Sequence, residues 1–178
     1  MKINIIKIAL ALVAIIISSY VAITLPISEQ GIPFTAQSLV VFICAAFLSP
    51  KEIAVTLCLY ILLGIAGLPV FAEGTSGWSK LTGASGGFLW GFLVCGVMIS
   101  QSYKKNHGLL SVIVTMILAT IILFICGLGQ LTVKFGFDKA VEYGLTPFWK
   151  MGLLKAFLAA SVVFFTNSIL NRDKKVRS

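Results

Sequence analysis

Six apolar stretches, each about 17 to 21 residues long, run through most of this chain. A helix needs roughly 20 apolar residues to cross the hydrocarbon layer of a membrane, which is about 30 Å thick. Backbone groups find no water partner there, so apolar runs of this length are expected to be helices. We place the spans at residues 8–25, 33–49, 53–72, 84–101, 109–129 and 151–170. The expected fold is therefore all-α, with residues 1–178 forming a single polytopic transmembrane domain.

The composition agrees with a membrane protein. Hydrophobic residues make up 58% of the chain and charged residues 11%, whereas a soluble domain has about 25% charged residues. The first stretch has an alternative interpretation as a secretory signal peptide, whose apolar region is about 7 to 15 residues long. The stretch is longer than that, and its removal would still leave five spans. We interpret it as a membrane helix.

Basic residues indicate the orientation of the helices, because cytoplasmic loops carry more of them. One set of loops and both termini hold Lys2, Lys7, Lys51, Lys104, Lys105, Arg172, Lys174, Lys175 and Arg177. The opposite loops hold Lys80, Lys134, Lys139 and Lys150. We therefore expect both termini in the cytoplasm, as an even number of spans requires. The net charge of +8 is spread along one membrane face, which favours contact with anionic lipid over a nucleic-acid partner.

The sequence predicts no cofactor and no metal. The four cysteines lie inside expected spans without CxxC spacing, and are typical of small buried apolar residues. They are Cys44, Cys58, Cys95 and Cys126. The chain has no HExxH motif and no phosphate-binding G-x-x-x-x-G-K-[ST] loop. If uptake of a substrate is driven by ATP, another subunit must supply the ATPase.

Two segments on the outer side, 26–37 and 69–87, interrupt the apolar pattern. The second is rich in glycine, hydroxyl and aromatic residues. Irregular backbone at membrane depth is tolerated where it lines a cavity, and small-molecule sites combine apolar walls with a few polar groups. We interpret these segments as parts of a binding site, with ordinary surface loops as the alternative. Gly86 and Gly87 open the fourth span, where missing side chains allow close approach of a ligand or backbone.

Lys155 is a charged residue inside the sixth expected span. Charge within a membrane is costly and is by default a sign of function. A second interpretation is equally open, because the outer surface is only about 7 Å away along the helix and the side chain can extend to it.

On the first helix, Ala14, Ser18 and Ala22 repeat every four residues. Such a small-residue stripe favours close docking of another helix.

The glycine-rich segment also allows a catalytic interpretation. Gly83-Ala84-Ser85-Gly86 matches the G-x-S-G pattern of rhomboid-type intramembrane serine proteases. The single histidine, His107, is expected at the far end of the fourth span, about 30 Å from Ser85. A nucleophile and its base must lie within hydrogen-bonding distance, about 3 Å. An intramembrane serine hydrolase that uses Ser85 is thus an alternative from a different class, and we expect no enzyme.

Three blocks carry a resemblance that covers most of the chain: PFTAQSL at 33–39, LYILLGIAGLPVFA at 59–72 and GASGGFLWGF at 83–92. They resemble the BioY family, the biotin-specific substrate-binding (S) components of energy-coupling-factor (ECF) transporters. The resemblance implies a six-helix protein of the prokaryotic cytoplasmic membrane that binds its vitamin near the outer face. It also implies docking onto a transmembrane coupling subunit that bears two ATPases. In the family, small residues of the first helix commonly serve that docking. By the same resemblance, Lys155 matches a lysine that lines the binding pocket.

The chain also departs from the family pattern. Where the family usually has Pro-Gly-Asp, this chain has Lys150-Met151-Gly152, so the carboxylate is absent. That carboxylate would accept the ureido N–H groups of biotin through strong charge-assisted hydrogen bonds. Ala84 and Ser85 also stand where Pro and Thr are usual. Either other acceptors such as Gln37 or Ser85 replace the contact, or the ligand is another small carboxylate vitamin.

The expected function is capture of biotin, or a similar vitamin, outside the cell by a transport subunit. A scaffold without a small-molecule ligand is a further alternative. The candidate substrate-binding residues are Thr35, Gln37, Phe71, Trp78, Ser85, Gly86, Gly87 and Lys155.

Overall fold

The structure is a computed structural model that describes the backbone of residues 3–23 and 34–176 and the side chains of residues 3–22 and 34–170. Several positions named above lie outside the described residues. They are Lys2, Leu25, Pro33, most of the segment 26–37 and the side chains of Arg172, Lys174, Lys175 and Arg177.

Within these ranges the chain forms six long helices. They are α1 (Ile5–Tyr20), α2 (Gln37–Phe47), α3 (Pro50–Ile65), α5 (Gly86–Lys105), α6 (Leu109–Phe135) and α8 (Trp149–Val176). Short helical turns lie between them: η1 (Ala72–Gly74), α4 (Trp78–Leu81), α7 (Phe137–Ala140) and η2 (Val141–Leu145). Strands β1 (Ala22–Ile23) and β2 (Phe34–Thr35) pair antiparallel. The all-α class is thus confirmed.

Each expected span overlaps one long helix, but two of these helices end earlier than expected. Helix α1 ends at Tyr20, because the chain then enters β1 and Ala22 pairs with Thr35. Helix α3 ends at Ile65, so the prediction of a helix as far as residue 72 is wrong there. Gly67 has a φ of +97°, a left-handed conformation that suits glycine, and Pro69 cannot donate a helical hydrogen bond.

Five of the long helices are strongly apolar. Three segments are long and apolar enough to cross a bilayer, namely α5, α6 and Trp149–Leu170 of α8, while α1 and α2 are apolar but shorter. Their outward faces expose large apolar side chains, such as Leu10 on α1 and Ile125 on α6. Large exposed apolar patches are rare on soluble monomers, so this surface fits contact with lipid.

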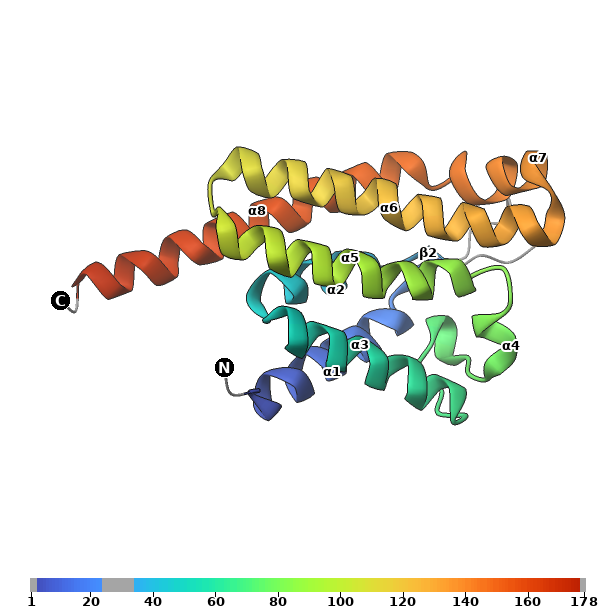
Figure 1. The fold of residues 1–178 in the computed structure, drawn as a ribbon, viewed down its shortest axis with the longest axis horizontal. Coiled ribbons are helices and arrows are strands. Elements are labelled where there is room, and N and C mark those ends of the chain that lie inside the picture. The colour runs from blue at the N-terminus through green and yellow to red at the C-terminus, as the bar shows by residue number, and fades with distance from the viewer. Residues whose placement is uncertain (1–2, 24–33, 177–178) are drawn as a thin grey trace.

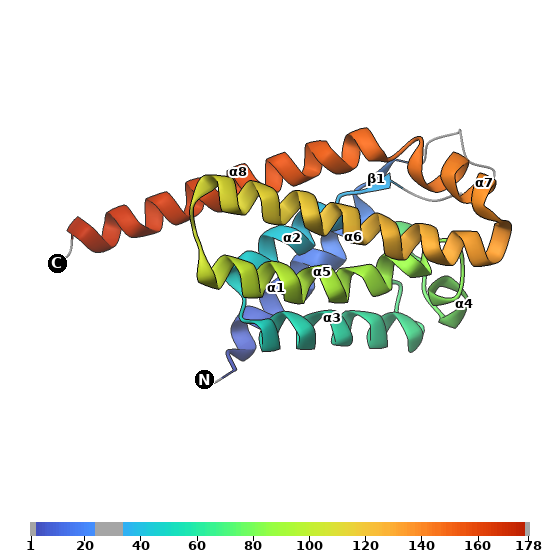
Figure 2. The ribbon, with the colours of Figure 1, turned by 45° about the horizontal axis from the view of Figure 1, so that its top comes forward.

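The helices pack as a bundle with α5 at its centre. In two views, α5 lies between α6 and α3 (Figures 1 and 2), and α2 packs against α1, α5 and α8. One end of the bundle, here called the loop end, carries α4, α7 and the β1–β2 pair. The opposite end, here called the turn end, carries the start of α1 and the α2–α3 and α5–α6 turns. Helix α8 extends past the turn end in both views.

Glycines set the close approach of α5 to α6, the most extensive helix pair of the bundle. A Cβ on Gly87 would overlap the carbonyl oxygen of Cys126 and lie 2.9 Å from the Cα of Gly127. A Cβ on Gly127 would in turn overlap the ring of Phe88. Small residues allow this kind of backbone contact between membrane helices.

A carboxylate fastens the start of α1 to the turn between α2 and α3. Glu52 accepts hydrogen bonds from the backbone N–H of Ser49 at 2.8 Å and of Asn4 at 2.9 Å, and the Ser49 hydroxyl accepts from the Glu52 N–H. The Ser49–Glu52 pair forms a capping box at the start of α3. The hydrogen bonds from Ser49 and Asn4 lower the pKa of Glu52 to about 2, so this carboxylate is ionised at neutral pH.

Candidate substrate-binding site

A cavity of about 360 Å³ opens at the loop end of the bundle. Its lining comes from β2, α2, the segment between α3 and α5, and helices α5, α6 and α8. This volume falls in the range of roughly 300–1,000 Å³ that is usual for small-molecule sites. The described parts of the two irregular segments therefore line a concavity, and its use as a binding site stays a prediction.

Aromatic rings form much of the cavity wall. The rings of Phe34 and Phe148 stack at a centroid distance of 6.0 Å, and Phe88 meets Phe124 edge to face at 6.3 Å. Phe71, which was predicted from sequence, lines the cavity and is almost fully buried. The ring of Phe71 packs where Gly64 lacks a side chain, since a Cβ there would overlap it. Such walls suit a flat or compact apolar ligand body.

Lys155 points into the bundle from α8. Its Nζ donates to the carbonyl oxygen of Thr35 at 2.5 Å and to the hydroxyl of Ser38 at 3.4 Å. The ammonium also lies 3.7 Å from the centroid of the Phe34 ring, in a cation–π contact. The Lys155 ammonium is thus held at the cavity wall and does not extend to the outer surface. Among the described lining residues the charged side chains are Lys80 and Lys155, both of them basic.

Gln37 and Thr35 form a hydrogen-bonded unit beside this lysine. The Thr35 hydroxyl donates to the Gln37 Oε1 at 3.1 Å, and the Gln37 Nε2 donates to the Tyr60 hydroxyl at 2.5 Å. Both residues line the cavity, and Gln37 is buried. The Gln37 amide therefore has a fixed orientation, with one N–H still free of these two bonds for a ligand.

The segment before α5 places the remaining candidates differently. Ser85 precedes the first residue of α5 and lines the cavity. Gly86 and Gly87 begin α5 as expected, but they lie outside the lining and pack toward Leu81 and α6. Trp78 also lies outside the lining, with its side chain 60% exposed. Contact of these three residues with a substrate stays a prediction.

Gly152 lies in the cavity lining, opposite the rings of α6. A Cβ on Gly152 would stand 2.7 Å from Cε2 of Phe124 and 3.2 Å from Cγ2 of Thr120. The place that a longer side chain would need is therefore partly taken by the Phe124 ring. Residue 152, where the family carboxylate is absent, thus lies in the cavity wall, and the Phe124 ring occupies part of the space that a carboxylate side chain would need.

Several lining residues were missed by sequence reasoning. Ser38, Thr120, Phe124 and Phe148 lie within or beside apolar runs, where they resemble lipid-facing residues. Gln130 of α6 was missed as well, although a polar residue in an apolar run was a usable signal. Its Nε2 donates to the carbonyl oxygens of Leu81 at 3.1 Å and Gly83 at 2.5 Å, which fixes the segment before α5.

The small-residue stripe is only partly helical. Ala14 is half-buried on α1, and Ser18 is buried with its hydroxyl donating to the carbonyl of Ile15. Ala22 lies in β1, so the expectation that it shares a face of the first helix is wrong. The helix ends before it, because the chain turns to pair with β2. Docking through Ala14, Ser18 and Ala22 stays a prediction.

The geometry separates the two residues of the serine hydrolase interpretation. Ser85 and His107 lie at opposite ends of α5, a helix of 20 residues, which is about 30 Å long. A hydrogen bond between them is excluded at that separation. Within the described residues, no group of three or more His, Cys, Asp or Glu side chains is close enough to hold a metal.

Comparison with known proteins gives a consistent result. The chain is 34% identical over 154 residues to the biotin transporter BioY2 of Lactococcus lactis subsp. cremoris (strain MG1363), covering 84% of this chain and 82% of the relative. It is 30% identical over 167 residues to the probable biotin transporter BioY of Rickettsia prowazekii (strain Madrid E), covering 93% and 84%. The fold matches the crystal structure of the S-component for biotin from an ECF-type ABC transporter with a TM-score of 0.81, at 20% identity, over 92% of this chain and 90% of that chain. The profile of the BioY family matches residues 2–172, and the chain belongs to that family.

Proposed function

We propose that this chain is the biotin-binding S component of an ECF-type uptake transporter. The observation that carries the proposal is the position of Lys155, whose ammonium lies at the wall of an aromatic cavity in a membrane bundle. The relatives named as biotin transporters supply the ligand. The described lining holds basic but no acidic side chains, which favours a ligand with a carboxylate.

The geometry suggests how biotin binds. Its two fused rings, an apolar thioether ring and a polar ureido ring, are compact and would fit between the Phe71, Phe88 and Phe124 side chains. Its carboxylate can take the place of the Thr35 carbonyl at Lys155, which forms a charge-assisted hydrogen bond. The free N–H of Gln37 can donate to the ureido oxygen, and the Ser85 hydroxyl can accept from a ureido N–H. As an acceptor for a ureido N–H, the neutral Ser85 hydroxyl would replace the family carboxylate, which is absent at Gly152.

The remaining steps of transport require partners. Because the sequence has no phosphate-binding ATPase loop, a coupling subunit with ATPases would supply the energy, and this chain would act as a binding subunit without catalysis. We propose six membrane crossings for the six long helices, all in one transmembrane domain of the prokaryotic cytoplasmic membrane. The loop end, and with it the cavity, would then face outward.

Equilibrium binding tests the proposed ligand directly. We expect the purified protein to bind labelled biotin saturably, and unlabelled biotin to displace it. Biotinamide has a neutral amide in place of the carboxylate. It should compete about tenfold more weakly, because Lys155 then has no charged partner on the ligand. Thiamine and riboflavin serve as unrelated vitamins. Saturable binding of another carboxylate vitamin, without binding of biotin, would leave the site intact but contradict the proposed ligand.

Cysteine labelling tests the proposed orientation. In a variant with the four native cysteines replaced by alanine, a cysteine at Ser76 should react with a membrane-impermeant maleimide added to intact cells. A cysteine at Asn106, exposed in the α5–α6 turn, should react only after the cells are opened. The reverse pattern would place the cavity on the cytoplasmic side and contradict the proposed direction of capture.

A further inference from the structure

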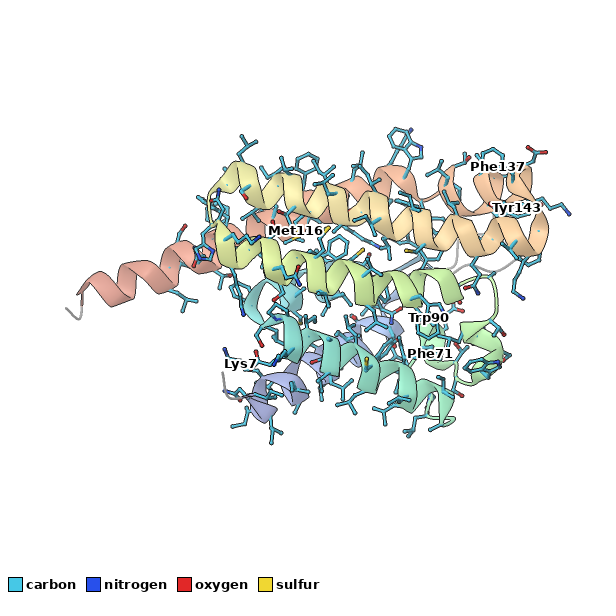
Figure 3. All side chains as sticks on the ribbon, in the orientation of Figure 1. Lys7, Phe71, Trp90, Met116, Phe137 and Tyr143 are labelled. Carbon is cyan, nitrogen blue, oxygen red and sulfur yellow. The ribbon has the colours of Figure 1, made fainter. Side chains whose placement is uncertain are left out.

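A second cavity, of about 460 Å³, lies at the turn end of the bundle. It is formed where the start of α1, the α2–α3 turn and the end of α5 meet. Figure 3 shows Lys7 at this end, far from Phe137 and Tyr143 at the loop end. The cavity is thus separate from the candidate substrate site and needs an explanation of its own.

The cavity gathers nitrogen donors from two helices. Lys7 reaches it from α1, and Lys104 and His107 reach it from the end of α5 and the turn that follows. The one acidic group in the described lining is Glu52, and both of its oxygens already accept backbone hydrogen bonds, from Asn4 and Ser49. The Lys7 ammonium and this carboxylate attract each other, so Lys7 and Lys104 together leave one net positive charge around the opening.

Tyr103 supplies an independent sign of a ligand. Its side chain is 8% exposed and lines the cavity, yet its buried hydroxyl has no hydrogen-bond partner among the residues that the structure describes. Phe47 packs edge to face against its ring at 6.2 Å and His107 at 4.6 Å, so the ring is held on two sides. A buried hydroxyl without a partner costs about 1–3 kcal/mol, and such groups are rare. If the exposed His107 side chain moved slightly aside, a ligand in the cavity could accept a hydrogen bond from the Tyr103 hydroxyl.

The surroundings of the cavity favour an amphiphile over a soluble anion or an acidic protein. Ile5 and Ile6 before Lys7 are more than 70% exposed, and so is Leu110 after His107. Large apolar side chains thus flank the basic opening at the end of the bundle, where helix ends meet the lipid headgroups. Acyl chains can cover these side chains while a headgroup enters the cavity. An acidic loop of a protein would leave them uncovered.

We infer that this cavity binds the phosphate group of an anionic membrane lipid. Lys7 and Lys104 provide charge-assisted hydrogen bonds to the phosphate oxygens, and the Tyr103 hydroxyl donates a further one. The inference depends on the bundle lying in a membrane, but it is independent of which vitamin occupies the first cavity.

Lipid retention by the full-length protein tests the inference. The purified protein is titrated with phosphatidylglycerol in detergent, and bound lipid is measured by native mass spectrometry. We expect one lipid to be retained preferentially over phosphatidylcholine. Lys104→Gln and Tyr103→Phe, the second of which changes no charge, should each weaken retention about tenfold or more, as expected for loss of one hydrogen bond to a charged group. Biotin binding by both variants should stay at the wild-type level.

Lys105→Gln is the matched control, because Lys105 adjoins Lys104 in sequence, is exposed and lies outside the cavity lining. It should change retention by less than about twofold. Equal losses in the two lysine variants, with none in Tyr103→Phe, would mean diffuse attraction to lipid charge and would overturn the inference. Displacement of the lipid by equimolar inorganic phosphate would overturn it in favour of a soluble anion. Failure to retain phosphatidylglycerol would overturn the inference. If partner subunits, but not the lipid, then protected Lys7 and Lys104 from acetylation, the cavity would be a protein contact.

Discussion

Lys155→Met is expected to weaken biotin binding about ten- to a hundredfold. The substitution keeps a long apolar side chain on α8 but removes the ammonium that lies against Thr35, Ser38 and the Phe34 ring. A hydrogen bond to a charged group contributes about 1.5–3 kcal/mol, which corresponds to this change in dissociation constant. Isothermal titration of the purified variant with biotin measures it.

Lys150→Met provides the control for the loss of one positive charge. Lys150 lies earlier on the same helix, is exposed and has its Nζ 5.6 Å from the centroid of the neighbouring Trp149 ring. Its replacement should leave biotin affinity within about twofold of the wild type. If Lys155→Met also binds as the wild type does, the lysine serves only to hold Thr35, and the assignment of the ligand carboxylate to it is wrong.

Gly87→Ala is expected to lower the free energy of unfolding by about 1–3 kcal/mol, the usual cost of forcing an extra methyl group into a packed contact. The new Cβ would overlap the Cys126 carbonyl oxygen and lie 2.9 Å from the Cα of Gly127. These are backbone atoms and cannot rotate away, so α5 must move from α6. The temperature at which the detergent-solubilised protein loses its monodisperse peak in size-exclusion chromatography reports the change.

Gly129→Ala on α6 is the matched control, since a Cβ there has nothing within 4 Å. Alanine is favoured over glycine in a helix by up to about 1 kcal/mol, so this variant should be as stable as the wild type or more so. Equal stability of the two variants would show that α5 and α6 do not depend on the glycine contact. A fall in biotin binding by Gly87→Ala without loss of stability would instead favour a direct role for Gly87 in the site.

The helices could be predicted from apolar length because a membrane imposes one requirement on every crossing. Their ends were less predictable. The apolar run continues past Tyr20 and past Ile65, but pairing of Ala22 with Thr35 and the left-handed turn at Gly67 depend on neighbours that local composition does not encode. Helix α2 ends at Phe47, close to the expected end of the second span at residue 49, because Pro50 and the Ser49–Glu52 capping box begin the next helix.

The candidate site was predictable where a residue stood out from its surroundings. Lys155 did so as a charge in an apolar run, although its direction could not be inferred, because a lysine can reach either the surface or the bundle interior. Phe124 and Phe148 could not be found, because a phenylalanine in a membrane helix looks the same whether it faces lipid or a cavity. Trp78 was chosen as an aromatic residue in a glycine-rich loop, but its side chain is exposed and lies outside the cavity lining, so its contact with a substrate stays a prediction.

The length of α8 has a practical consequence. Its 28 residues extend over about 42 Å, some 12 Å more than the hydrocarbon layer, and the excess projects past the turn end (Figures 1 and 2). A fluorescent protein or an immobilisation tag joined beyond α8 would be separated from the bundle by this helical projection. Single-molecule or surface-based recordings could then observe ligand capture without disturbing either site.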